Sequence, residues 1–336
     1  MRPTTDQVNY LNLGLMVISC VFAYIIPFEL FLFAYAVLGP LHYLTEISWL
    51  HDRKYFVEAK RGRDKKAKRA WLILVAATLA VMLFGVIAEK ILKQSVTPIW
   101  EIAFFYLVFV MASGLWLSRK RSTGIAVIAL TVITLIFFNG SRYYALFAFF
   151  LITIVHVFVF TAAFILFGAL KSKSRSGLLS LIGFVLCGLS FFVYAPSALG
   201  HTVGDYVRNS YSSFQTLNAE LIKIFQLGTG ASVSEIYESS AGLTVMRFIA
   251  FAYTYHYLNW FSKTSIIKWH EIPRSRTAII VGLWLIALGV YGYSYQAGML
   301  MLYFLSVLHV MLEFPLNHYT LAAIGKELYV LARSPA

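Results

Sequence analysis

Two short stretches place a histidine and a glutamate four positions apart within apolar sequence. GPLHYLTEI carries His42 and Glu46, and VLHVMLEF carries His309 and Glu313. An α-helix advances about 100° per residue, so side chains four positions apart lie on one face. Neutral imidazole and carboxylate are donor types that bind iron, manganese and zinc. Each stretch is therefore a candidate metal or proton-handling site.

Two further histidines lie in apolar sequence. His156 stands in ITIVHVFVF and His256 in YTYHYLNWF. An ionisable side chain inside a bilayer costs about 2 to 3 kcal/mol even on lenient insertion scales, and such residues usually mark functional sites. The question is then which elements carry the four histidines and whether they bring them to one level.

The composition predicts an all-α, polytopic integral membrane protein. Of the 336 residues, 60% are hydrophobic and only 13% are charged, and the mean hydropathy is +0.73. A chain with so little polar surface cannot cover a soluble globule. Cys20 and Cys187 both lie in apolar runs, so they indicate neither a disulfide framework nor a cysteine metal site.

Ten apolar runs have about the length that crosses a hydrocarbon core. They predict a single helical domain over 1–336, with the first two spans joined closely around Pro27. The predicted spans are 9–26, 27–50, 71–89, 98–117, 123–139, 143–170, 177–195, 244–262, 277–294 and 297–318.

The basic residues orient these ten spans. Alternate loops, including the strongly basic loop 51–70, together with the two termini hold 22 of the 28 lysines and arginines. By the positive-inside rule both termini are expected to be cytoplasmic, in a bacterial-type cytoplasmic (inner) membrane. The net charge of +13 is thereby explained by topology and lipid headgroups, without nucleic acid as a partner.

The ten-span topology brings the four histidines to similar depths. At 1.5 Å per residue they lie about 10 to 22 Å from the cytoplasmic boundary, on four helices that run in the same direction. We therefore predict one metal site in this layer. Glu46 and Glu313 are predicted to orient the rings, to ligate the metal or to act in catalysis.

Several other residues carry secondary predictions. Trp49, Tyr255 and Trp260 are expected to line a substrate pocket, and Pro315 to end or kink the last span. His51, His270 and His318 are expected at the solvated inner edge, and His201 with Asp205 at the outer surface. The outer loop 196–242 is predicted to contain an amphipathic helix, because Phe214, Leu217, Leu221, Ile224 and Phe225 recur at helical spacing.

The four histidine motifs, in order and spacing, resemble those of the Brp/Blh family of membrane β-carotene 15,15′-dioxygenases. The resemblance implies that His42, His156, His256 and His309 are iron ligands. The motifs also differ: Gly39 and Pro40 are one position away from the family's Gly-x-Pro-His pattern. Glu46 and Glu313 replace aspartates, the latter with shorter spacing, and Trp260 stands where the family's third motif has a second histidine.

We therefore expect an Fe(II)-dependent membrane oxygenase that uses O2, with Zn or Mn as alternative metals. Its substrate would be lipid-soluble: a carotenoid, another isoprenoid or an acyl lipid. The reaction would be C=C cleavage, hydroxylation or desaturation. Two alternatives stay open, namely a proton- or ion-coupled transporter that uses the buried His and Glu residues, and a di-iron lipid desaturase or hydroxylase.

Overall fold

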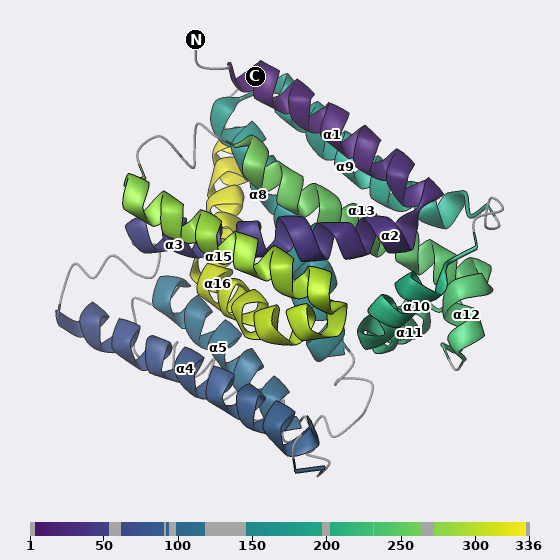
Figure 1. Ribbon diagram of the computed structural model, residues 1–336. Helices are drawn as coiled ribbons and strands as arrows, with labels where there is room; N and C mark the ends of the chain where they lie inside the picture. Colours follow the sequence, from purple (N-terminus) through teal and green to yellow (C-terminus); the bar gives the residue numbers. More distant parts are fainter. Residues whose placement is uncertain are drawn as a thin grey trace. The chain divides into compact units, whose positions relative to one another are not determined.

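The computed structural model describes residues 4–53, 62–90, 92–93, 99–117, 146–196, 202–230, 232–263 and 272–333, and these ranges contain helices and no strand. The all-α prediction is confirmed for this part of the chain (Figure 1). The first half contains α1 (Thr5–Ile25), α2 (Pro27–Phe33), η1 (Ala34–Leu38), α3 (Gly39–Arg53), α4 (Gly62–Lys90), α5 (Ile99–Leu117) and η2 (Leu146–Phe160). The second half contains α8 (Thr161–Ser172), α9 (Arg175–Val193), α10 (Asp205–Tyr211), η3 (Ser212–Phe214), α11 (Gln215–Ile224), α12 (Val233–Glu238), α13 (Ser240–Ser262), α15 (Arg274–Tyr293) and α16 (Tyr295–Arg333).

Seven of the described helices are long and apolar enough to cross a membrane. They are Thr5–Ile25, Pro27–Asp52, Arg69–Glu89, Thr153–Ser172, Arg175–Val193, Arg274–Tyr293 and Tyr295–Arg333. Leu186 of α9 and Ile286 of α15 are 61% and 58% exposed, as expected of side chains that face lipid. These helices indicate a membrane protein.

The predicted count of ten spans and the orientation of the termini stay predictions. The predicted spans 98–117 and 244–262 form helices α5 and α13, which are not among the seven. The predicted span 123–139 lies outside the described residues.

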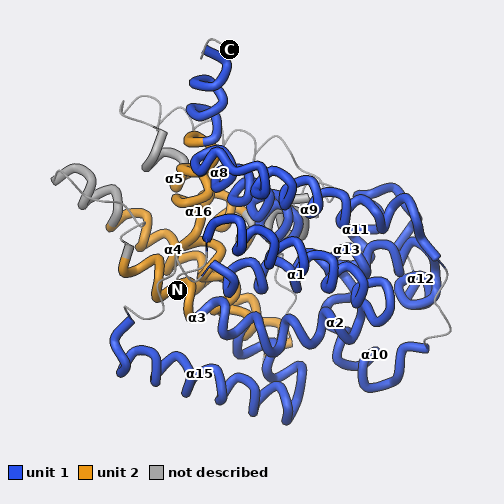
Figure 2. The backbone as a smooth tube through the Cα atoms, turned by 90° about the horizontal axis from the view of Figure 1, so that it is seen from above, with its two compact units in different colours: residues 1–44, 149–302, 324–336 blue, residues 45–148, 303–323 orange. Residues whose placement is uncertain are grey.

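The chain divides into two compact units, which Figure 2 shows in blue and orange. Unit 1 comprises 1–44, 149–302 and 324–336, and unit 2 comprises 45–148 and 303–323. The boundaries fall inside α3, η2 and α16. The unit boundaries therefore do not coincide with loops, where domain boundaries are usually expected from sequence.

Helix α13 forms the centre of unit 1. Every residue from Gly242 to Tyr257 is buried, and the helix contacts α1, α2, η1, α9, α11 and α12. A helix buried on all sides need not be apolar throughout, provided that its polar groups find partners in protein. Around it, α1 and α9 lie side by side (Figure 1). The side chain of Ser239 caps α13 by accepting from the N–H of Gly242, which sets where the helix begins.

The predicted amphipathic helix is present as α11, and it packs on α13. Leu217 and Leu221 are buried, and the preceding Phe214 stacks edge-on against Phe31 of α2 with 4.9 Å between ring centroids. Together with α10 and α12, this segment covers one end of unit 1. Its apolar face is therefore occupied by protein, as expected of a helix that caps the bundle.

Two π-helical segments adjoin the candidate histidines. In η1 the N–H of Gly39 donates to the carbonyl of Ala34, five residues back, and His42 follows one turn later. Pro40 has no N–H to donate, so the regular ladder is interrupted at this point. η2 carries His156. Single π turns inside α-helices are frequent at functional sites.

In unit 2, α4 packs against α5. Helix α4 begins at Gly62, so the second half of the predicted basic loop 51–70 is helical. Helix α16 continues through Pro315 to Arg333, so the prediction that this proline ends the helix is wrong, and the alternative of a kink stays a prediction. At 1.5 Å per residue its 39 residues reach about 58 Å, well beyond the thickness of a hydrocarbon core.

Gly230, in the turn between α11 and α12, is expected to be irreplaceable. Its φ of 62° lies in the left-handed region, and a Cβ atom there would meet the carbonyl oxygen of Ala219 at 2.4 Å. We expect Gly230→Ala to destabilise the fold by about 2 kcal/mol or more. The measurement is the apparent Tm of the detergent-purified protein. Gly204→Ala is the control, because φ is −69° and the added Cβ meets nothing within 4 Å. Equal Tm values for the two variants would contradict this assignment.

Candidate metal centre

His256 lies on α13, the central helix of unit 1, and one of its ring nitrogens is hydrogen-bonded to another side chain. Its Nδ1 lies 2.8 Å from the hydroxyl oxygen of Thr161 on α8, and both residues are buried. When Nδ1 carries the proton and donates it to Thr161, the lone pair resides on Nε2. This arrangement of a histidine oriented by a second residue is usual at metal sites.

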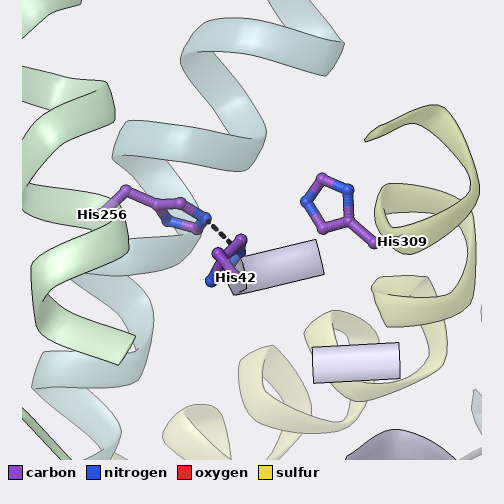
Figure 3. A group of neighbouring side chains, drawn as sticks. All are labelled: His42, His256 and His309. Carbon is purple, nitrogen blue, oxygen red and sulfur yellow. Dashed lines mark hydrogen bonds between the residues drawn. The ribbon is translucent and has the colours of Figure 1, made fainter. Parts of the chain in front are cut away.

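His42 faces that second nitrogen. Its Nε2 lies 3.2 Å from Nε2 of His256, and Figure 3 shows the two rings meeting along this line. Two lone pairs at this distance repel, so the pair needs either a shared proton or a cation. Two nitrogens bound to one metal at about 2.1 Å each would be 3.2 Å apart at an N–metal–N angle of about 100°. The observed separation therefore fits a shared metal ion.

Aromatic side chains surround the His42 ring. The ring centroids of Tyr257 and Trp260 lie 5.0 and 5.6 Å from it. The hydroxyl groups of Tyr43 and Tyr257 are hydrogen-bonded at 2.8 Å, and both residues are fully buried. A Cβ atom at Gly39 would lie 3.0 Å from the Tyr43 hydroxyl, so a side chain there would crowd this pair. The His42 ring thus lies among aromatic side chains, two of which are phenols, beside the ring of His256.

His156 belongs to the same unit and is also buried. Its ring centroid lies 5.1 Å from that of His256. Of the three predicted histidine ligands of unit 1, His256 therefore lies next to both others.

Unit 2 holds the remaining predicted residues. Helix α16 carries His309 and Glu313, which are each 3% exposed, and the α3 segment of this unit carries Glu46, which is 2% exposed. The carboxylates of Glu46 and Glu313 interact electrostatically. Two buried acids in one unit are costly unless a cation or proton accompanies them.

Figure 3 draws three buried histidines of the described residues, His42 and His256 of unit 1 and His309 of unit 2. Each of these rings offers a nitrogen atom of the type that binds metals. Imidazole ligands of this kind suit iron, zinc and copper.

The predicted pocket residues have different surroundings. Trp260 is half-buried beside His42, as described above, whereas Trp49 is buried in unit 2. Tyr255 donates from its hydroxyl to Oδ1 of Asn12 on α1 at 3.1 Å. It lines a separate cavity, which is considered below.

The remaining histidines divide between surface and interior. His51 is exposed, as predicted, with its side chain 76% accessible. His318 was expected at the solvated edge, but it is buried, with Nδ1 donating to the carbonyl of Phe314 at 2.7 Å. The reason is that α16 extends well past it and its ring packs against Phe109. His201 and His270 lie outside the described residues, and Asp205 begins α10 at the surface.

Sequence reasoning missed Thr161 and the pair of Tyr43 with Tyr257. The tyrosines are adjacent in sequence to His42 and His256, which was an available signal. Thr161 is 95 residues from His256 in the chain, and nothing in the sequence links the two.

Comparisons with protein-family models, with curated proteins and with solved structures give no match.

Proposed function

We propose that this protein is a membrane-embedded, iron-dependent oxygenase that acts on a lipid-soluble substrate. The observation that carries the proposal is the pair of buried Nε2 atoms of His42 and His256, 3.2 Å apart, with Thr161 holding the far nitrogen of His256. A catalytic metal centre needs neutral imidazoles at such a spacing. Histidines that only stabilise helix packing have no need to bring their nitrogens so close together.

The proposed ligand set is His42, His156, His256 and His309. The first three belong to unit 1, and His309 is the proposed contribution of unit 2. Iron is favoured over zinc or manganese by the resemblance to the Brp/Blh motifs. Bound iron with open coordination positions would supply the activation of O2.

The chain's own residues would position and protect the reaction. Thr161 fixes the tautomer and orientation of His256. Glu46 and Glu313, both buried, would hold or release protons beside the site. The apolar wall around His42, including Trp260, would exclude water from an oxidising centre.

A buried site in a membrane protein selects substrates that dissolve in lipid. A carotenoid, another isoprenoid or an acyl chain would reach it without crossing water. We propose C=C cleavage, hydroxylation or desaturation as the reaction, in a bacterial-type cytoplasmic membrane with both termini in the cytoplasm. Cleavage follows from the motif resemblance alone.

A second candidate is a proton- or ion-coupled transporter. The electrostatic interaction between the buried carboxylates of Glu46 and Glu313 favours it, because paired acids at depth are a feature of proton relays. Such a protein would need the carboxylates but no resident metal.

Elemental analysis of the detergent-purified protein, followed by O2 assays, distinguishes these functions. We expect about one iron per chain and substrate-dependent consumption of O2, with label from 18O2 in the product of a carotenoid or acyl lipid. A zinc-loaded preparation should bind substrate without turnover. Two irons per chain would favour the desaturase alternative. A folded protein with no metal would overturn the oxygenase proposal and favour transport.

A further inference from the structure

Unit 1 contains a cavity of about 510 Å³ that the metal proposal does not use. Its walls come from α1, α8, α9 and α13, all in the same unit. Residues at the ends of helices line one part: Thr5 begins α1, Lys171 lies in the last turn of α8, and Lys263 follows α13. Since α1 and α8 are candidate membrane spans, this part of the cavity lies at the level of a membrane boundary.

The cavity continues from this boundary into the spans. Phe164 and Ile165 of α8 lie about two helical turns deeper than Lys171, or about 10 Å at 1.5 Å per residue. Tyr255 on α13 is similarly far from Lys263. One end of the cavity is thus basic and polar, and the other is apolar and aromatic.

One polar side chain of the lining has an oxygen atom without a hydrogen-bond partner among the described residues. Asn259 is 6% exposed, and its Oδ1 has no hydrogen-bond partner among the described residues. A buried amide oxygen of this kind needs a donor. In contrast, the neighbouring Asn12 is satisfied, because Tyr255 and Ser262 both donate to its Oδ1. Asn259 is thus a polar side chain of the cavity wall whose amide oxygen has no donor among the described residues.

The two lysines supply the complementary charge. Lys263 is half-buried, and burial lowers the pKa of its ammonium group to about 8. An anion beside the ammonium group would favour its charged form. Asp6 is the acidic residue in the first turn of α1, and its carboxylate accepts from Ser174 and Ser176. It is not among the residues that line the cavity.

We propose that this cavity binds a phospholipid whose headgroup combines a phosphate with hydroxyl groups, as in phosphatidylglycerol. Lys171 and Lys263 bind the phosphate, the headgroup hydroxyl groups lie against the polar wall that contains Asn9 and Asn259, and an acyl chain occupies the apolar end beside Phe164 and Ile165. The interfacial position of the lysines and the apolar end favour a lipid over a water-soluble phosphate. The proposal does not depend on the metal centre or on the oxygenase function.

Gly168 gives a way to fill the cavity without changing charge. It lines the cavity, and a Cβ atom added to it would meet nothing within 4 Å. Gly168→Leu should therefore fold and occupy ligand space. Gly282→Leu on α15 is the matched control, because its added Cβ also meets nothing and it does not line the cavity.

Native mass spectrometry of the full chain in detergent, with phosphatidylglycerol or phosphatidylcholine added, tests the proposal. We expect the wild type to retain phosphatidylglycerol about tenfold better than phosphatidylcholine. The double variant Lys171→Gln, Lys263→Gln should lose this preference, and Gly168→Leu should lose retention. Lys173→Gln, which removes a neighbouring exposed charge outside the cavity, and Gly282→Leu should behave as the wild type.

Three outcomes would overturn the proposal. They are equal retention of the two lipids by the wild type, an equal loss of preference in Lys173→Gln, and unchanged retention in Gly168→Leu. Glycerol 1-phosphate serves as the soluble arm of the test. If it displaces the lipid at comparable concentration, the site is one for a free phosphate ester and the lipid assignment is wrong.

Discussion

Replacing His256 with alanine is expected to reduce bound metal from about one ion per chain to less than about a tenth, because the ring lies between the two other candidate ligands of unit 1. It contacts His42 through Nε2 and packs against His156. Removing this ring takes away one of the few imidazole ligands that could share the ion, and metal affinity falls steeply when a ligand is lost. The same loss is expected for His42→Ala. Metal content per chain, measured by elemental mass spectrometry, checks both.

Two additions keep this experiment decisive. Truncating a buried side chain costs stability whatever its role, so His256→Gln, which keeps most of the volume, should lose metal while the helical circular dichroism spectrum is retained. His51→Ala is the control, since His51 lies on the same helix as His42 but is exposed. Equal metal content in wild type and His256→Gln would remove the metal centre from this position.

The sequence was sufficient to predict that the described part of the chain is helical, because apolar runs and helix caps are local patterns. Apolar length defines a membrane helix, and the cap residues Ser174 and Ser239 set where α9 and α13 begin. The His-x3-Glu spacing correctly predicted that each histidine and glutamate share one helix. The same local reasoning recovered α11 from its apolar periodicity.

Features that depend on packing could not be read from the sequence. The burial of His318 depends on how far α16 extends. The helix continues through Pro315, although proline lacks the N–H group that a regular helix uses. Helix α13 is the clearest case: its tyrosines, threonines and histidine make it less apolar than the seven candidate spans, yet it is the most buried helix of unit 1. A strongly apolar composition indicates a helix that faces lipid, whereas α13 is surrounded by protein.

The π turn before His42 and the partner of His256 were also beyond local reasoning. The effect of Pro40 on hydrogen bonding was foreseeable, but whether the chain bends, breaks or forms a π turn depends on contacts such as that between Gly39 and Tyr43. Thr161 is an ordinary residue in an apolar helix until the fold places it beside His256. Residues of this kind orient a ligand without any motif of their own.

Thr161 therefore provides the second strong test of the metal centre. In Thr161→Val the shape of the side chain is kept while the hydroxyl that contacts Nδ1 of His256 is removed. The ring then loses the group that fixes its tautomer, and its buried Nδ1 loses this partner. Changes to such supporting residues typically lower metal affinity by about 10- to 100-fold. Competition with a chelator of known affinity measures the change.

Thr161→Ser separates this role from simple packing. Serine keeps the hydroxyl and loses a methyl group, so we expect an affinity close to wild type with a small loss of stability. Thr78→Val in α4 is the matched control, because Thr78 is equally buried and its hydroxyl donates only to the carbonyl of Leu74. It should leave metal affinity unchanged. If Thr161→Ser weakens binding as much as Thr161→Val, the contact contributes through packing. If neither variant weakens it, His256 binds metal without help from α8 or does not bind it.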